Sequence, residues 1–335
     1  MGQGVKPLSG VSQSLQGPET SQSIKPETPF PAMAFRLEGV VVPMVTPYAR
    51  DSSLDLEATR WLSSNLSSRG VAGIFVNSSV GEFVHLSRDE VIKLTRQVIE
   101  AKGGGVKVMG GVSANYTEDA VSLGKALVDV GVDAIVATTP FYFKVGPEAL
   151  IRHFSIIADK VDVPLIIYNI PIFTGIEIPL SVYLKLLEHQ NVVGTKVTVD
   201  SLDYMRRLIL RLKPIRRDFS IMTGFDDYLL PLLLMGGDGG VMGLANAVPQ
   251  VHLSVYRSWK EEKLREASEE WRKLLSLERI YDHCGSYTAS IKGALEVLGT
   301  PVKRYVREPL VPCGEEEERS IGEILRSSGV LGERG

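Results

Sequence analysis

Short apolar runs alternate with amphipathic segments from Gly39 onwards. Eight of these runs have the length of buried strands and are rich in Val and Ile, at 39–46, 72–77, 106–112, 133–140, 164–169, 192–197, 219–224 and 239–246. Apolar residues recur with helical spacing in the intervening segments, at 54–68, 87–101, 117–130, 147–160, 179–189, 201–212 and 226–235. Ser87 and Glu90 predict a capping box, and Pro147 and Pro179 suit the first turns of two further helices.

This alternation predicts an α/β fold, a TIM (β/α)8 barrel, which typically takes about 250 residues. An open doubly wound sheet is disfavoured because no G-x-G-x-x-G loop follows the first strand. The pattern is purely helical after Pro249, with helices expected at 251–262, 265–281, 287–298 and 315–327. We therefore expect a barrel over residues 33–249 and a C-terminal helical region, residues 250–335, packed on it.

Residues 1–32 differ from the rest of the chain. They are rich in Ser, Gln, Gly and Pro and lack both helical and strand periodicity, so we expect this segment to be disordered. The segment has neither the apolar stretch of a secretory signal nor the Arg-rich pattern of a transit peptide. Met33 directly precedes the first foldable sequence. Translation that starts at Met33 is therefore as compatible with the sequence as a functional tail formed by residues 1–32.

Composition excludes several classes of partner. The formal net charge of −3 gives no support for nucleic-acid binding, and the longest apolar runs are too short for a membrane span. The two cysteines, Cys284 and Cys313, argue against a disulfide framework and fit a reducing compartment. We therefore expect a cytoplasmic protein.

Two residues at predicted strand ends carry the candidate chemistry. Tyr168 ends the run at 164–169, and Lys196 lies at the end of the next run along the chain. If the segment between them is a crossover helix, the two side chains lie side by side where α/β folds place their active sites. Burying an ammonium is costly unless its pKa falls, and a neutral lysine amine can add to a carbonyl. The pattern therefore favours a nucleophilic lysine.

A structural role is the competing interpretation. A lone lysine at a strand end is more often a salt-bridge or snorkelling residue. Tyr168 on the preceding strand and Thr198 shift the balance towards chemistry. The remaining predicted strand ends carry mostly hydroxyl and small residues, with no carboxylate cluster. The five histidines lack metal-ligand spacing, so we expect no metal site.

An amine and a phenol support Schiff-base chemistry on a 2-oxo acid. In this hypothesis Lys196 condenses with the ketone, and Tyr168 transfers the proton to and from the substrate hydroxyl. The backbone amides of Ser79 and Val80 would hold the carboxylate, and Gly224 would leave space beside the lysine. The alternative for the 77–83 loop is an ordinary turn between a strand and a helix.

Several segments together resemble the dihydrodipicolinate synthase/N-acetylneuraminate lyase family of pyruvate-dependent class I aldolases. VVPMVTP resembles the family's opening strand, and NSSVGEFVHLS resembles its G-[ST]-[ST]-G-E loop. TTPFYF resembles the family's T-P-Y-Y segment. Its Y-N-x-P-x-x-T-G and G-x-K-x-[ST] segments resemble YNIPIFTG and GTKVT. Its later G-D-D and G-G-x-G-V-x-x-x-A-N segments resemble TGFDD and GGDGGVMGLAN, and Tyr168 and Lys196 are separated as in the family. The resemblance extends from Phe35 to the end of the chain.

The resemblance implies a role for individual residues. Lys196 matches the Schiff-base lysine, Tyr168 the proton shuttle, and Ser79 the hydroxyl that passes protons to that tyrosine. Tyr142 matches an aromatic residue that reaches into a neighbouring subunit's site, which implies a homotetramer built as a dimer of dimers. Val241 matches an apolar residue that lines the pyruvate pocket. The resemblance implies no cofactor beyond the covalent Schiff base.

Three departures from the family's motifs bear on the substrate. Val80 stands where a second hydroxyl is common, and Phe141 replaces the first tyrosine of T-P-Y-Y. Phe173 occupies the place of an arginine that receives a carboxylate in the synthases, which a phenyl ring cannot do. Thr198 resembles a threonine of the sialic-acid and 2-keto-3-deoxygluconate aldolases that contacts substrate hydroxyls.

These departures favour a lyase that splits a 2-keto-3-deoxy sugar acid, or a similar 4-hydroxy-2-oxo acid, into pyruvate and an aldehyde. The alternative is 4-hydroxy-tetrahydrodipicolinate synthase, which joins pyruvate and aspartate semialdehyde, with its carboxylate clamp supplied from elsewhere in the chain. A sugar-acid dehydratase and a non-catalytic binding barrel are further alternatives. Possession of both Lys196 and Tyr168 argues against the last of these.

Overall fold

The computed structural model describes residues 35–332, together with Met1. Apart from Met1, the segment expected to be disordered, residues 1–32, lies outside the described residues, and its disorder stays a prediction. Residues 35–332 belong to one compact unit.

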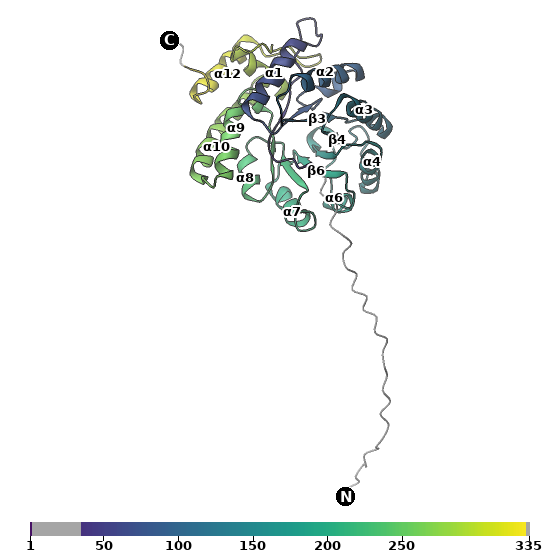
Figure 1. Cartoon of the computed structure of the whole chain (residues 1–335). Helices are drawn as coiled ribbons and strands as arrows, with labels where there is room; N and C mark the ends of the chain where they lie inside the picture. Colours follow the sequence, from purple (N-terminus) through teal and green to yellow (C-terminus); the bar gives the residue numbers. More distant parts are fainter. Residues whose placement is uncertain (2–34, 333–335) are drawn as a thin grey trace. The chain divides into compact units, whose positions relative to one another are not determined.

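Eight parallel strands close into a barrel in chain order, with β8 pairing back to β1. The strands are β1 (Gly39–Pro43), β2 (Gly73–Val76), β3 (Lys107–Gly111), β4 (Ala134–Thr138), β5 (Leu165–Asn169), β6 (Val192–Val197), β7 (Ser220–Thr223) and β8 (Gly239–Val241). The predicted TIM barrel is therefore confirmed. Figure 1 shows helices arranged around the strands.

Helices on the outside of the barrel correspond to the seven predicted segments. They are α1 (Leu56–Arg69), α2 (Arg88–Ala101), α3 (Thr117–Val130), α4 (Pro147–Lys160), α6 (Leu180–Leu186), α7 (Leu202–Leu212) and α8 (Leu229–Leu234). A further short helix, α5 (Pro171–Thr174), follows β5 and was not predicted. The capping box at α2 is confirmed, since Ser87 Oγ accepts from Glu90 N and Glu90 Oε2 accepts from Ser87 N. A short 3-10 helix, η1 (Phe83–His85), precedes α2.

Several predicted boundaries are wrong by three residues or more, and two of them have a local reason. The helix expected to begin at Asp226 begins at Leu229 instead, which places Pro231 in its first turn; further inside a helix the proline ring would clash with the carbonyl four residues earlier. The strand expected over 239–246 ends at Val241, and a 3-10 helix, η2 (Leu244–Asn246), follows. There the Leu244 amide donates to the Asp226 carboxylate (3.2 Å), which turns the chain out of the barrel.

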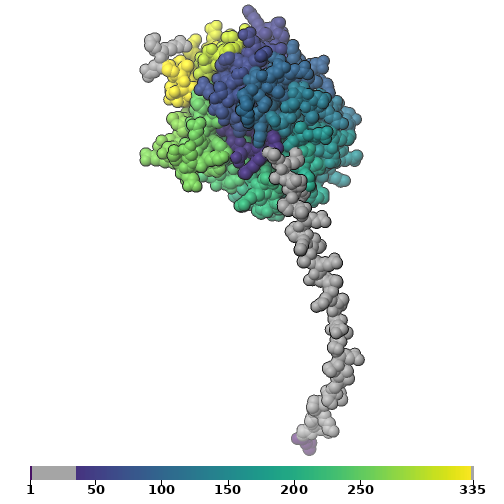
Figure 2. All heavy atoms as spheres, viewed as in Figure 1, coloured from purple at the N-terminus to yellow at the C-terminus, as the bar shows by residue number. Residues whose placement is uncertain are grey.

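The C-terminal region is helical, as predicted, and it packs on the barrel. It contains α9 (Pro249–Lys260), α10 (Leu264–Glu278), η3 (Arg279–Asp282), α11 (Tyr287–Val297) and α12 (Glu315–Ser327). Figure 2 shows α12, in yellow, near the purple segment that includes α1. The Arg307 guanidinium donates to the Ser52 carbonyl (2.9 Å). In the described residues no helix is long and apolar enough to cross a membrane.

Two layers of buried side chains hold the barrel. The larger layer lies between the strands and the helices, as strand alternation requires. The smaller layer fills the barrel interior and includes Val41, Phe75, Met109, Ile166 and Tyr168. Tyr168 therefore lies in the interior layer and not between the sheet and the helices.

The structure contradicts the expectation of reduced cysteines. Cys284, between η3 and α11, forms a disulfide with Cys313, just before α12, with Cα atoms 5.0 Å apart. The two thiols are 29 positions apart in the sequence, and only the fold of the C-terminal helices brings them together. A single disulfide joins segments within the C-terminal region and does not form a framework for the fold.

Candidate active site

Tyr168 and Lys196 are register partners on the neighbouring strands β5 and β6. The Lys196 Nζ atom lies 4.0 Å from the centroid of the Tyr168 ring and 5.5 Å from that of Phe75. The Phe75 and Tyr168 rings themselves meet edge to face at 6.4 Å. Three side chains on three strands thus place the amine against aromatic faces at the carboxyl end of the barrel, as the strand pattern predicts.

Lys196 is the unpaired member of a small group of buried charges. Among the described residues the buried Asp, Glu, Lys and Arg side chains are Glu82, Lys196, Asp226, Asp238 and Lys292. Four of them have a partner of opposite charge or a histidine within 4 Å, with Glu82 and Lys292 paired to each other. Lys196 is 3% exposed and forms no ion pair within residues 35–332. The salt-bridge interpretation of this lysine therefore has no partner to support it.

A cavity of about 410 Å³ opens beside the lysine. The structure brings eight of the nine residues predicted for the site to its wall, namely Ser79, Val80, Tyr168, Phe173, Lys196, Thr198, Gly224 and Val241. Tyr142, the ninth, is 80% exposed and lines neither this cavity nor the larger one beside it. Its ring packs edge to face on Phe143 at 5.1 Å. Within one chain, Tyr142 is not part of the site.

Gly224 leaves room for the lysine and for Thr198. A Cβ atom at position 224 would overlap Thr198 Oγ1 and would lie 3.0 Å from Lys196 Cε. Thr198 Oγ1 is itself buried without a hydrogen-bond partner among the described residues. A buried hydroxyl without a partner is costly, and a substrate hydroxyl would satisfy it.

We expect Gly224→Ala to lower the rate of pyruvate-adduct formation about a hundredfold, because a shift of about 1 Å at a reacting group costs that much. The measurement is the rate of borohydride-trapped adduct by intact mass. Gly146→Ala is the matched control, since nothing lies within 4 Å of a Cβ atom there. Equal rates for the two variants would contradict the role assigned to Gly224.

The loop that follows β2 contributes two residues with free backbone amides to the cavity wall. The amides of Ser79 and Val80 donate to no acceptor in the part of the chain that the structure describes. Two residues of this loop that are not glycine, Asn77 and Glu82, have positive φ angles of 59° and 58°. Such strain persists only where surrounding contacts fix it, so the loop is held in one shape. Free amides in a fixed loop suit a carboxylate ligand.

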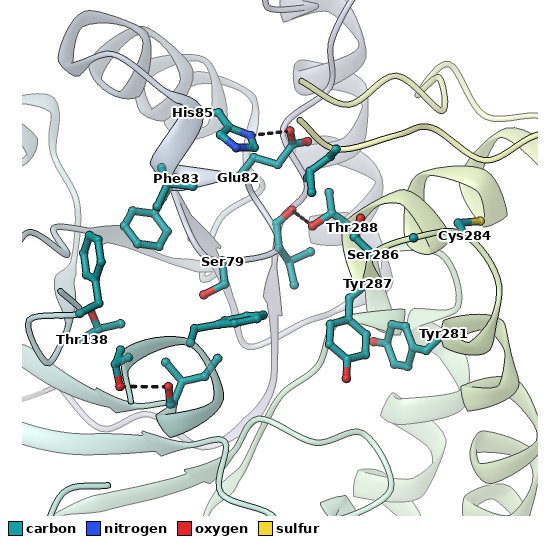
Figure 3. Close-up of a pocket in the computed structure, with 18 residues that line it drawn as sticks. Ser79, Glu82, Phe83, His85, Thr138, Tyr281, Cys284, Ser286, Tyr287 and Thr288 are labelled. Atoms are coloured by element: carbon teal, nitrogen blue, oxygen red, sulfur yellow. Dashed lines mark hydrogen bonds and ion pairs between the residues drawn. The ribbon is translucent and has the colours of Figure 1, made fainter. Parts of the chain in front are cut away.

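The contacts that fix this loop come from the C-terminal region, which the sequence interpretation left out of the site. Glu82 Oε1 accepts from Lys292 Nζ on α11 (2.6 Å), and Glu82 Oε2 accepts from the Arg307 amide (2.9 Å). Thr288 Oγ1 donates to the Val80 carbonyl (3.1 Å), a bond drawn in Figure 3. Burial lowers the pKa of Lys292 to about 8, against the opposing effect of Glu82. The C-terminal helices are therefore structural parts of the candidate site.

The expectation that the rim carries no carboxylate cluster is wrong. Four carboxylates, Asp226, Asp227, Glu278 and Asp282, line the lysine cavity. Asp226 is engaged, since it accepts from Tyr281 Oη (3.0 Å) and contacts His252 Nε2 (2.6 Å). The sequence motif TGFDD indicates the first two carboxylates, whereas Glu278 and Asp282 arrive from the far end of α10 and from η3.

The pKa of Glu278 is raised in this environment. Burial, with Asp226 and Asp227 nearby, raises the pKa of Glu278 from its ordinary 4.5 to about 8. The folded protein therefore holds a neutral Glu278 carboxyl at pH 7, with its Oε1 accepting from the Asp227 amide at 3.0 Å. The pKa of Asp227 is also raised, mainly by burial and secondly by the nearby charge of Asp226.

We expect Glu278→Gln to gain stability relative to the parent protein as pH rises from about 4.5 to about 8. In the unfolded chain Glu278 loses its proton above about pH 4.5, whereas in the folded state it keeps the proton up to about pH 8. Ionisation of Glu278 therefore favours unfolding between these two pH values. Gln cannot ionise and keeps the amide contact. Thermal unfolding between pH 5 and 9 tests this, with the exposed Glu188→Gln as control. Parallel curves for Glu278→Gln and the parent would contradict the assignment.

Phe173 lies on α5 and is 56% exposed at the cavity wall, where the resemblance places an arginine in the synthases. Arg279, at the start of η3, lines the same cavity. A guanidinium is thus available from a different element. Within residues 35–332 no group of three or more His, Cys, Asp or Glu side chains is placed to hold a metal ion.

Comparisons with known proteins agree with this geometry. A model of the dihydrodipicolinate synthetase family matches residues 36–328. An uncharacterized DapA-like lyase of Thermofilum pendens is 52% identical over 299 residues, covering 89% of this chain and 99% of that protein. The probable 2-dehydro-3-deoxy-D-pentonate aldolase YjhH of Escherichia coli is 34% identical, covering 88% and 99%. The crystal structure of E. coli YagE in complex with pyruvate gives a TM-score of 0.85 at 29% identity, covering 88% and 99%.

Proposed function

Because the chain belongs to the dihydrodipicolinate synthetase family, we propose that it is a pyruvate-dependent class I aldolase with Lys196 as the Schiff-base residue. The substrate class that we favour is a 2-keto-3-deoxy sugar acid or a similar 4-hydroxy-2-oxo acid, cleaved reversibly to pyruvate and an aldehyde. The observation that carries the proposal is the buried Lys196 amine, which lies without an ion pair against the Tyr168 ring.

Each step of the cleavage has a group in the cavity. The Lys196 amine adds to the C2 ketone and water leaves, which gives an iminium that withdraws electrons from C3. Tyr168 gives its proton to the departing water, and the resulting phenolate takes the proton of the C4 hydroxyl. The C3–C4 bond then breaks, and the aldehyde departs from an enamine. Tyr168 passes this proton to C3, and water adds to the iminium with transfer of a proton back to Tyr168, which releases pyruvate and restores the amine and the phenol. The free amides of Ser79 and Val80 are suited to hold the carboxylate throughout.

Groups suited to a hydroxylated substrate lie beside the lysine. Thr198 Oγ1 is buried and lacks a partner among the described residues, and the Asp227 carboxylate lines the same cavity. Both can bind hydroxyl groups of an aldehyde half. The E. coli protein that is 34% identical is described as a probable aldolase of such a sugar acid. These points support the sugar-acid class over aspartate semialdehyde.

4-Hydroxy-tetrahydrodipicolinate synthase is the second candidate, and Arg279 favours it. Phe173 cannot bind the carboxylate of aspartate semialdehyde, but the Arg279 guanidinium at the cavity wall is chemically able to do so. In that case Arg279→Ala abolishes turnover of aspartate semialdehyde and leaves pyruvate binding intact. A dehydratase acting on a sugar acid would use the same lysine.

We further propose that Tyr142 completes the site of a neighbouring subunit in a homotetramer. Its 80% exposure within one chain is consistent with that role, because a large exposed aromatic side chain is typical of an interface. A cytoplasmic location also stays a proposal. The disulfide between Cys284 and Cys313 does not decide it, because intracellular proteins of hyperthermophiles also contain disulfides.

A panel of substrates tests the proposed function. Purified protein is incubated with 2-keto-3-deoxy sugar acids, and released pyruvate is measured with a coupled dehydrogenase. Pyruvate and aspartate semialdehyde are assayed in parallel. Pyruvate release from a sugar acid that is lost in Lys196→Ala supports the aldolase, whereas efficient turnover of aspartate semialdehyde alone would favour the synthase.

A further inference from the structure

A second, larger hollow opens beside the lysine cavity. It has a volume of about 660 Å³, within the usual range for a small-molecule site, and Figure 3 shows the residues around it. The two cavities share six wall residues, Ser79, Val80, Ile170, Phe173, Tyr281 and Tyr287. We call the larger hollow the phenyl chamber, after the Phe83, Phe141 and Phe173 side chains in its wall. The shared wall places the phenyl chamber directly beside the lysine cavity.

Apolar side chains form much of the phenyl chamber wall that is not shared with the lysine cavity. Phe83 and Phe141 meet edge to face with ring centroids 6.0 Å apart. Val84 and Leu310 also line the chamber and not the lysine cavity, whereas Phe173 lines both. An edge-to-face pair leaves ring surface available to a further aromatic or alkyl group.

Most polar groups in the chamber wall are already engaged. Thr174 Oγ1 donates to the Ile170 carbonyl (3.1 Å), and Thr288 Oγ1 donates to the Val80 carbonyl. Glu82 is paired with Lys292, and Tyr281 Oη donates to Asp226. Thr138 Oγ1 is buried without a partner among the described residues and could bind one hydroxyl. The remaining hydroxyls of a polyol would lose hydrogen bonds to water and recover few, whereas an apolar group would gain by leaving water.

Resting on the proposed function, we propose that the phenyl chamber binds an alkyl or aryl group on the substrate's fourth carbon. The enzyme would then use two kinds of aldehyde, hydroxylated ones beside Thr198 and Asp227 and apolar ones in the chamber. In synthesis, the enamine of pyruvate forms the C3–C4 bond with the aldehyde carbon, and the aldehyde oxygen takes a proton from Tyr168. The proton that C3 lost on enamine formation restores Tyr168, and one water releases the 4-hydroxy-2-oxo acid from Lys196.

The test compares benzaldehyde with D-glyceraldehyde as partners for pyruvate. Product formation is followed by chromatography for the parent protein, for Phe141→Ser and for Ile215→Ser, whose exposed apolar side chain lines neither cavity. The parent protein and Ile215→Ser convert benzaldehyde to 4-hydroxy-2-oxo-4-phenylbutanoate. Phe141→Ser lowers kcat/KM for benzaldehyde about tenfold or more and leaves that for glyceraldehyde unchanged. Val84→Ser, at an exposed position in the same wall, serves if Phe141→Ser does not fold.

The trapped pyruvate adduct separates the two ways in which this inference can fail. An adduct on Lys196 without any conversion of benzaldehyde overturns the inference and leaves the aldolase standing. A covering of the chamber by a second copy of the chain would give that same result. Equal losses for both aldehydes in Phe141→Ser also overturn it, because the side chain would then act on the whole site. Absence of the adduct overturns the proposed function and the inference together.

Discussion

Lys292→Met destabilises the protein by about 3–5 kcal/mol, because it leaves the buried Glu82 carboxylate without its cation. The substitution also removes the hydrogen bond that Lys292 Nζ donates to the Tyr305 carbonyl (2.7 Å). It removes as well the contact of Lys292 Nζ with the Tyr48 ring, 4.3 Å from the ring centroid. Chemical denaturation at pH 7 measures the change in the free energy of unfolding. Since Glu82 ends the loop that presents the Ser79 and Val80 amides, the KM for pyruvate rises as well.

A double-mutant cycle separates the pair from the rest of the packing. Glu82→Gln combined with Lys292→Met removes both charges, so the double variant recovers part of the stability that Lys292→Met loses. Lys160→Met is the matched control, because Lys160 and its partner Glu118 are about half exposed and such pairs contribute little. Additive losses in the cycle would contradict the coupling between Glu82 and Lys292.

Tyr168→Phe lowers kcat by about 10²–10⁴-fold while the enzyme still forms its pyruvate adduct. The phenyl ring keeps the packing on Phe75 and beside the Lys196 amine, and only the hydroxyl that moves the proton is lost. Single-turnover kinetics separates adduct formation from cleavage of the C3–C4 bond. Phe75→Leu is the control for aromatic packing, since it removes a ring near Lys196 that carries no proton. A Tyr168→Phe variant with parental kcat would exclude the phenol as the proton shuttle.

The sequence was sufficient to predict which side chains lie close together on adjacent strands of the barrel. Parallel strands joined by helices must be adjacent, so the apolar runs that end near Tyr168 and Lys196 place these two side chains together. The same rule brings Ser79, Thr198, Gly224 and Val241 to one rim. Proline and capping signals at α2 and α4 fixed those helix starts because they act within a few residues.

Contacts between distant segments were not predictable in the same way. Glu82 and Lys292 are separated by 210 positions, and no local pattern states that α11 lies over the β2 loop. Glu278 reaches the lysine cavity only because of the way α10 packs on the barrel. The partner of Cys284 depends likewise on the path of the C-terminal region. Most important, a sequence cannot show that a buried lysine lacks a counter-charge, and this is the feature that distinguishes Lys196 from Lys292.

The measurement that tests the central claim most directly is intact-mass analysis after incubation with pyruvate and borohydride. The parent protein gains the mass of one reduced pyruvate adduct, and peptide mapping places it on Lys196. Lys196→Ala gains none, whereas the exposed-site control Lys160→Ala gains the same mass as the parent. A folded parent protein without an adduct, or an adduct that persists in Lys196→Ala, would contradict the Schiff-base account.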